Sequence, residues 1–165
     1  MTTPSPRRLL TAALVECSDD LLRYFLRRLE REDAADALAD VMTTAWSRVD
    51  VLPAAPTEAR MWLFGIARNV LLHAQRGSTR RSRLADRLRT TLGQRTATAA
   101  DHGVEIRDAI GRLDPDLAEL VRLVHWDGFS LVDAAELLGI PASTARGRYQ
   151  RAKDALRDVL APTPR

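Results

Sequence analysis

Small, amide and guanidinium side chains cluster near the C-terminal end of this 165-residue chain. At about 100° per residue they share the outer side of one helix, and the opposite side is apolar. Glutamine and arginine can read base edges, arginine also neutralises phosphate, and small residues let a helix approach DNA closely. The candidate contacts to a DNA major groove are Ser143, Thr144, Arg146, Gly147, Arg148, Gln150 and Arg151.

Two short helices joined by a tight turn, within residues 127–156, are needed to position these side chains. Ser130 precedes an apolar run and Asp133 follows it by three residues, which is the pattern of a capping box. Gly139 can take the positive φ that ends a helix, and Pro141 suits the start of the next one. The pattern predicts a helix-turn-helix, and it favours DNA binding over a helical hairpin whose basic face is merely solvated.

Composition predicts helical cores and argues against a disulfide-linked, metal-binding or enzymatic protein. The chain is 45% hydrophobic but only 5% aromatic, which predicts aliphatic and alanine-rich helical cores. The net charge is only +3, yet residues 60–95 hold nine arginines and one aspartate. Cys17 is the single cysteine and the three histidines have no cysteine partners, so we expect no disulfide, metal or cofactor. The sequence shows neither a nucleophile–base pair nor a phosphate-binding loop, so we do not expect an enzyme.

The remaining sequence predicts further helices and a linker. We expect helices at 9–15, 19–31, 33–49 and 58–76, with Ser18 or Asp19 and then Thr57 as caps, and a basic helix at 80–91. The prediction is an all-α protein with an N-terminal domain (1–92), a flexible linker (93–104) and a C-terminal helix-turn-helix domain (105–165). No run approaches the ~20 apolar residues of a membrane span, so a cytoplasmic protein without membrane insertion is expected.

Residues 112–156 resemble the C-terminal promoter-binding domain of bacterial extracytoplasmic-function sigma factors. In that family an "LP" element leads a helix, "GLS" with an "EIA" core follows, and the second helix reads "TVRSRxxRA" or similar. Here Asp114 separates the leucine from the proline, and Gly147 stands where serine is usual. The matching positions are Leu113, Pro115, Gly128, Phe129, Ser130, Ala134, Ala135, Thr144, Ala145, Arg146, Arg148, Arg151 and Ala152.

The sequence DAADALADVMTTAW, residues 33–46, resembles the helix of that family that docks on the β′ clamp helices of RNA polymerase. Asp40 replaces a glutamate and Ala39 a glutamine. Taken alone, such acids more commonly form a solvated helix face, and this alternative stays open. The resemblance implies that the polymerase-docking residues are Asp33, Asp36, Asp40, Val41 and Thr44.

Residues 59–81 resemble the segment that holds the opened promoter strand near position minus ten. An amide can read the Watson–Crick edge of an unstacked base, and arginines can follow the strand's backbone. Gly65 replaces an arginine of the family, and Trp62 is expected in the core because it has helical spacing with Ile66. The implied strand contacts are Arg68, Asn69, His73, Arg76, Arg80 and Arg81.

The resemblance implies an alternative sigma factor that binds core RNA polymerase and promoter DNA and directs transcription initiation. Many members of the family are held by an anti-sigma factor, but nothing in this sequence identifies one. The alternative is a helix-turn-helix regulator that binds DNA without polymerase, and a module that binds only protein is a third hypothesis. Only the sigma-factor hypothesis explains both the acidic helix and the arginine-rich segment.

Overall fold

The computed structural model describes the backbone of residues 5–89 and 102–160, and the side chains of residues 5–77 and 105–160. Regular structure in these ranges is helical throughout, without a strand. The chain divides into two compact units, Met1–Gln94 and Arg95–Arg165. The predicted all-α fold with two helical domains is therefore confirmed. The segment predicted as a linker, 93–104, lies outside the described backbone except for its last three residues, which already belong to a helix.

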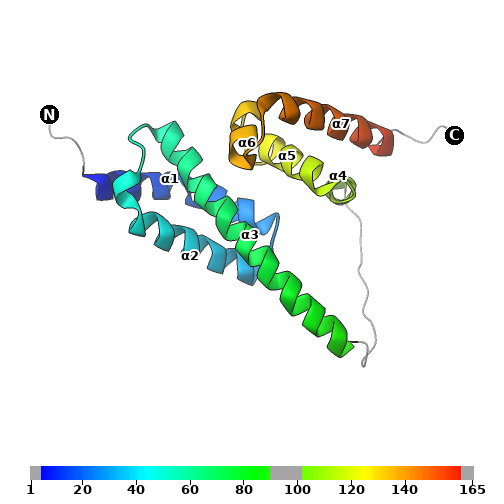
Figure 1. Ribbon diagram of the computed structural model, residues 1–165, viewed down its shortest axis with the longest axis horizontal. Coiled ribbons are helices and arrows are strands. Elements are labelled where there is room, and N and C mark those ends of the chain that lie inside the picture. Colours follow the sequence, from blue (N-terminus) through cyan, green and yellow to red (C-terminus); the bar gives the residue numbers. More distant parts are fainter. Residues whose placement is uncertain (1–4, 90–101, 161–165) are drawn as a thin grey trace. The chain divides into compact units, whose positions relative to one another are not determined.

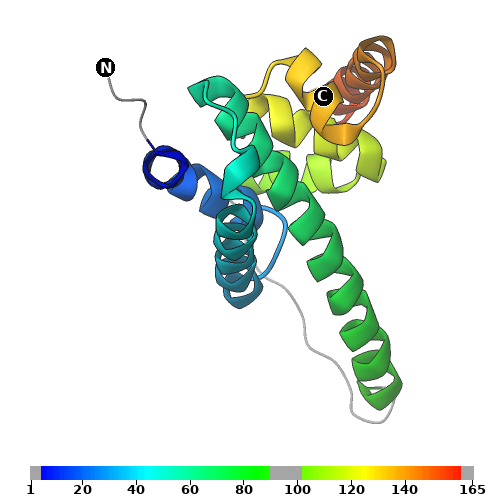
Figure 2. The same ribbon diagram turned by 60° about the vertical axis from the view of Figure 1, so that its left-hand side comes forward.

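Three helices form the N-terminal unit: α1 (Pro6–Leu26), α2 (Arg31–Ser47) and α3 (Pro56–Arg89), with a short 3-10 helix, η1 (Val49–Val51), before the last. Each of the three packs against the other two (Figures 1 and 2). The predicted break in α1, with Ser18 or Asp19 as a cap, is wrong. A single stripe of buried side chains runs along the helix, and burial of this stripe outweighs the local capping preference. The stripe consists of Leu10, Leu14, Cys17, Leu21, Tyr24 and Phe25.

α3 is longer than the sequence suggests. It begins at Pro56, which is suited to a first helical position, so Thr57 lies inside the helix instead of capping it. Over the described backbone, which reaches Arg89 here, the two helices predicted at 58–76 and 80–91 form one continuous helix through Gly77. A glycine costs a helix only about 1 kcal/mol relative to alanine, which good helix formers on both sides can offset. The last turns of α3 extend beyond α1 and α2 (Figure 1).

α2 packs through small residues. Ala34, Ala37 and Ala45 are at most 3% exposed, and together with the fully buried Val41 they form one face of the helix. Short side chains at these positions let α1 and α3 lie close to the α2 backbone. The acidic residues of α2 are consequently displaced to the other faces of the helix.

An aromatic cluster joins α1 to α3. The Tyr24 ring meets the edge of Phe64 with centroids 5.5 Å apart, and Phe64 is 1% exposed. The guanidinium of Arg60 lies 4.6 Å from the Phe64 centroid, and its NH2 donates to Asp20 Oδ2 at 3.3 Å. A favourable cation–π contact and an ion pair therefore cover the outer side of a buried ring.

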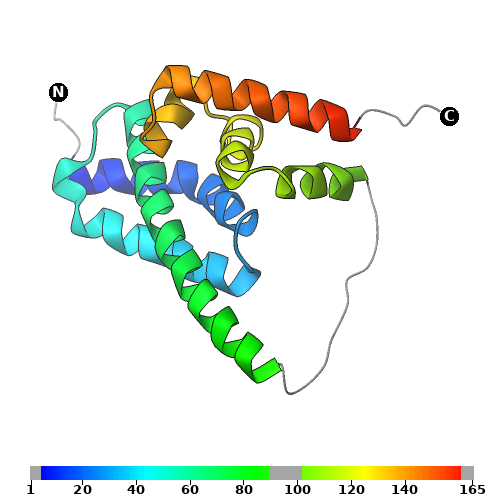
Figure 3. The ribbon, with the colours of Figure 1, turned by 45° about the vertical axis from the view of Figure 1, so that its right-hand side comes forward.

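The C-terminal unit contains α4 (His102–Gly111), α5 (Pro115–His125), α6 (Leu131–Leu138) and α7 (Ala142–Leu160). α7 packs along the other three helices (Figure 3). One core cluster of this unit consists of Ile110, Ala118, Val121 and Ala152, with Leu113, Leu117, Trp126 and Leu156 packed against it. Within the described ranges, no helix is both long enough and apolar enough to cross a membrane.

Phe64→Ala should lower the free energy of unfolding of the N-terminal unit by about 3–5 kcal/mol, because it removes a fully buried ring and leaves a cavity. Hydrogen exchange read by mass spectrometry can resolve the effect along the chain. Loss of protection is expected across α1, α2 and α3. Trp46→Ala is the control, since that ring is already 42% exposed. Equal losses in the two variants would contradict the assigned role of the cluster.

Candidate nucleic-acid interface

The start of α6 is capped by its own side chains. Ser130 Oγ accepts a hydrogen bond from the Asp133 backbone N–H at 3.1 Å and donates to Asp133 Oδ2 at 2.7 Å. One otherwise unpaired N–H of the first turn is thereby satisfied. The negative Asp133 carboxylate also lies at the positive end of the helix dipole. The predicted cap at Ser130 is confirmed.

The turn between α6 and α7 has the predicted geometry. Gly139 has a φ of +66°, which an L side chain rarely adopts, and its N–H donates to the carbonyl of Glu136. The Ile140 N–H reaches back to the Ala135 carbonyl at 3.0 Å, which closes the end of α6. Pro141 stands immediately before α7, and its carbonyl accepts the first bond of that helix from Ala145. The helix-turn-helix is confirmed.

The two predicted faces of α7 are also confirmed. Ala145 and Ala152 are fully buried, and Tyr149 and Leu156 are partly buried beside them. The structure leaves six of the seven candidate DNA contacts exposed to solvent, and the DNA contact itself stays a prediction. The six are Ser143, Thr144, Arg146, Gly147, Gln150 and Arg151.

Arg148 differs from the other candidates. Its side chain is only 27% exposed, and NH1 lies 2.8 Å from Asp116 Oδ2 in the first turn of α5. The N–H of Asp116 in turn bonds to Asp114 Oδ1, the cap of α5. Arg148 thus braces α7 against the start of α5. The sequence contained no signal for this pair, because its members are far apart in the chain and on different helices.

A second contact joins the same two helices. His125 Nε2 lies 2.6 Å from the Tyr149 hydroxyl, and the two rings are stacked with centroids 5.8 Å apart. The ammonium of Lys153 lies 5.2 Å from the Tyr149 ring. Together with Arg148, this stack fixes how far along its axis α7 lies against α5. The sequence pattern gave no sign of this contact, because the two residues are 24 positions apart and on different helices.

Gln150 also has a partner on its own helix. Its Nε2 donates to Asp154 Oδ1 at 3.1 Å, and Arg157 NH1 donates to the same oxygen at 3.0 Å. All three side chains are exposed. Asp154 and Arg157 were not among the candidates, although the four-residue spacing of Gln150 and Asp154 is typical of side-chain pairs on a helix.

On α3 the predicted strand contacts form a stripe. Asn69, His73 and Arg76 are exposed and follow one another at helical spacing, and Arg68 is partly buried at the edge. Trp62, expected in the core, is partly buried. α3 continues through Arg80 and Arg81, whose side chains lie outside the described ones.

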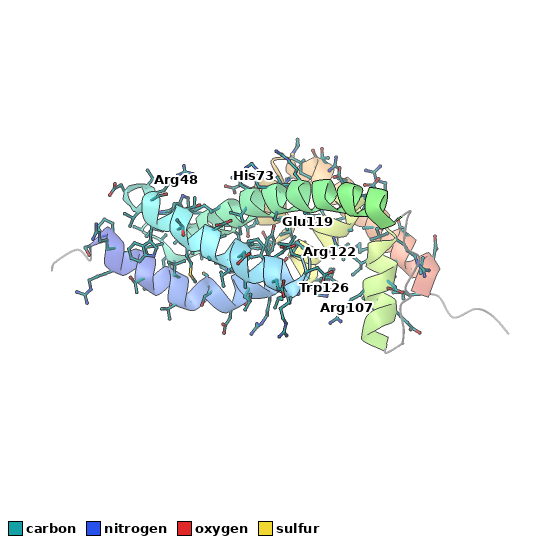
Figure 4. All side chains as sticks on the ribbon, turned by 90° about the horizontal axis from the view of Figure 1, so that it is seen from below. Arg48, His73, Arg107, Glu119, Arg122 and Trp126 are labelled. Carbon is teal, nitrogen blue, oxygen red and sulfur yellow. The ribbon has the colours of Figure 1, made fainter. Side chains whose placement is uncertain are left out.

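The predicted docking acids and one predicted strand contact meet in a single groove between α2 and α3. His73 is labelled on α3 in Figure 4. The groove has a volume of about 530 Å³ and is lined by Asp33, Asp36, Ala37, Asp40, Thr43, Thr44, Val70, His73 and Ala74.

Val41 does not belong to this surface. It is fully buried on the face that it shares with Ala34, Ala37 and Ala45, so its predicted place among the docking contacts is corrected to a core position. Asp36 and Asp40 are exposed, and Asp33 and Thr44 are partly exposed. Among the described residues, no group of three histidine, cysteine or acidic side chains is placed to hold a metal.

Comparison with known proteins bears on both units. The family model for Sigma-70 region 2 matches residues 14–81, and that for Sigma-70, region 4 matches residues 103–156. The chain is 32% identical over 154 residues to the ECF RNA polymerase sigma factor SigC of Mycobacterium tuberculosis, covering 90% of this chain and 82% of SigC. It is 27% identical over 157 residues to SigL of the same species, covering 92% and 89%.

Two solved structures share the fold. The sigma factor RpoE of Bartonella quintana, in complex with the anti-sigma factor NepR, has a TM-score of 0.71 at 23% identity, with 93% of this chain and 98% of that chain covered. CnrH, in complex with the cytosolic domain of CnrY, has a TM-score of 0.66 at 22% identity, with 93% and 88% covered. These likenesses concern the helical architecture alone.

The contact between Arg148 and Asp116 can be measured with a double-mutant cycle. Arg148→Ala and Asp116→Ala should be non-additive in the free energy of unfolding by a few tenths to about 1 kcal/mol, as is usual for partly exposed pairs. Thermal unfolding at low salt is the measurement. Arg151→Ala replaces Arg148→Ala in the control cycle, and additive effects are expected there. Equal coupling in both cycles would contradict a specific brace.

Proposed function

The chain belongs to the extracytoplasmic-function (ECF) sigma factors, and from this premise we propose that its two units divide promoter recognition between them. As an alternative sigma factor it binds core RNA polymerase and directs transcription initiation. The proposal assigns the upstream duplex element to the C-terminal unit. It assigns the melted strand and polymerase docking to the N-terminal unit. The protein would act in the cytoplasm and leave RNA synthesis to the polymerase.

The exposed, basic face that the turn at Gly139 presents on α7 is the observation that carries this proposal. The candidate contacts lie within the first ten residues of α7, a length of about 15 Å. A major groove about 12 Å wide can accept such a segment end-on or at an angle. Gly147 has no side chain on the outer face, so the helix backbone can come close to the bases.

The N-terminal unit suits a single strand. Asn69 offers an amide to an unstacked base, and Arg76 follows on the same side of α3, where it can contact phosphate. The length of α3 gives the strand a continuous track along one helix. The arginine-rich composition of residues 60–95 supports binding to a negatively charged backbone.

Docking on polymerase is assigned to the groove between α2 and α3. The exposed carboxylates of Asp36 and Asp40 favour a basic partner surface, and complementary charge raises both the rate and the specificity of association. His73 belongs to both the groove and the α3 stripe. A polymerase element bound in the groove would therefore lie beside the opened strand.

An anti-sigma factor is a further expected partner. RpoE of Bartonella quintana was solved in complex with one, and this chain shares the fold of that sigma factor. The alternative function, a regulator that binds DNA without polymerase, is not favoured, because it does not account for the match of the N-terminal unit to Sigma-70 region 2.

Asp40→Arg should weaken binding to core polymerase at least tenfold while the fold is kept. The side chain is exposed on α2, so the reversal alters surface charge without disturbing packing. Co-elution with core polymerase on size exclusion is the measurement, with helical content followed by circular dichroism. Asp19→Arg, an equal charge reversal at an exposed position of α1, is the matched control. Undiminished co-elution of Asp40→Arg would place the docking surface elsewhere.

Arg151→Ala and Asn69→Ala should fail at different steps. Loss of an arginine that holds a guanine edge costs about 1–3 kcal/mol at one base position, so Arg151→Ala should weaken the upstream footprint. Asn69→Ala should keep that footprint and lose melting, since its target base is reachable only after the strands separate. Permanganate reactivity of melted thymines beside upstream footprinting tests both. If Asn69→Ala melts promoters normally, Asn69 is an exposed residue of α3 that contacts no base.

A further inference from the structure

A negative side chain lies on the face of α7 that is assigned to DNA. Asp154 is one turn after Gln150 and is exposed with it on the side opposite the buried Ala145 and Ala152. A bare carboxylate there would repel phosphate. Arg157, whose NH1 lies 3.0 Å from Asp154 Oδ1, offsets this charge locally. The other hydrogen-bond partner of Asp154 is Gln150, a candidate base contact.

The chemistry of the pair fixes the orientation of the Gln150 amide. An ionised carboxylate accepts hydrogen bonds and cannot donate them, so only the NH2 end of the amide can face Asp154. The observed contact, Gln150 Nε2 to Asp154 Oδ1 at 3.1 Å, has this arrangement. The carbonyl oxygen Oε1 is then left at the other end of the amide, where it remains available as an acceptor. Turning the amide over would place two acceptors against each other.

We propose that Asp154 is a positioning residue for base recognition, which holds Gln150 so that its carbonyl oxygen meets the base edge in the major groove. This inference rests on the proposed binding of α7 to the upstream promoter element. In the major groove, adenine N6 and cytosine N4 donate hydrogen bonds, whereas guanine O6 and thymine O4 accept them. A fixed acceptor therefore selects adenine or cytosine at the contacted position and disfavours guanine and thymine.

Without Asp154 the amide of Gln150 can adopt either orientation. The flipped amide would present its NH2 group to guanine O6 or thymine O4, so all four bases would find a partner. Affinity for any sequence could even rise, because a negative charge leaves the DNA face. Loss of discrimination without loss of affinity is the signature that separates this role from a merely stabilising pair of side chains on a helix.

The test is selection from a promoter pool randomised across the upstream element, using core polymerase loaded with the full-length chain or its variants. Gln150→Ala first identifies the base position that the glutamine reads. At that position the wild-type chain should enrich adenine or cytosine over guanine and thymine. Asp154→Ala should reduce this preference by roughly threefold to tenfold, the range expected for one neutral hydrogen bond, and leave other positions unchanged.

Two variants control for charge and for the acceptor. Asp158→Ala removes an equal charge from an exposed position one turn further along α7 and should leave the base preference intact. Asp154→Asn keeps the size of the side chain but can donate as well as accept, so either orientation of the Gln150 amide finds a partner and the base preference should relax as in Asp154→Ala. In the Gln150→Ala background, Asp154→Ala should cause no further change in base preference.

The possible failures are distinguishable. If the wild-type chain enriches no upstream sequence, the proposed function of α7 fails and this inference fails with it. If enrichment is normal but Gln150→Ala changes no position, Gln150 does not read a base and only the inference is overturned. The inference alone is also overturned if Gln150 reads a base and Asp154→Ala preserves the wild-type preference, or if Asp158→Ala relaxes it equally.

Discussion

Close approach of helices over buried alanines is the constraint on which both units depend. Alanine lines the inward face of α2 at Ala34, Ala37 and Ala45, and that of α7 at Ala145 and Ala152. Each alanine buries little apolar area, so the stability gained comes from dense contact between neighbouring helices. The register of these alanines also decides which residues face outward. A larger side chain at any of them would displace the helix and turn its functional face away.

An alanine stripe leaves a helix free to slide along its partner, because the surface is smooth and apolar. In the C-terminal unit, polar contacts at the edge of the core restrict this sliding. Arg148 pairs with Asp116, and His125 bonds to Tyr149, so α7 is tied to α5 at two points along its length. The conformational entropy of positioning α7 is lost on folding and not again on binding. The exposed face of α7 that we propose to contact DNA is therefore ordered before it binds.

Local signals in the sequence were sufficient for the helix-turn-helix, but not for contacts between distant residues. The Ser130 cap and the Gly139 turn were predictable because each is decided by the chemistry of neighbouring residues. The false break at Ser18 arose because packing along the whole of α1 outweighs local preference. The continuity of α3 through Gly77 was missed because good helix formers on both sides can offset the small cost of one glycine. Val41 was misplaced because the family pattern records a residue type and not the direction of its side chain.

Separation of charge explains how a protein with a net charge of only +3 can serve two partners. The acids assigned to docking lie on α2, whereas the arginines assigned to DNA lie on α3 and α7. Only part of the protein surface therefore attracts the negatively charged DNA backbone. On the proposed function, the free chain is therefore expected to bind duplex DNA weakly, through phosphate contacts whose strength falls as salt rises. Docking on polymerase would change this balance, because both proposed DNA-binding surfaces would then be held near one promoter. Each contact becomes effectively intramolecular, and weak individual contacts can together give a specific complex.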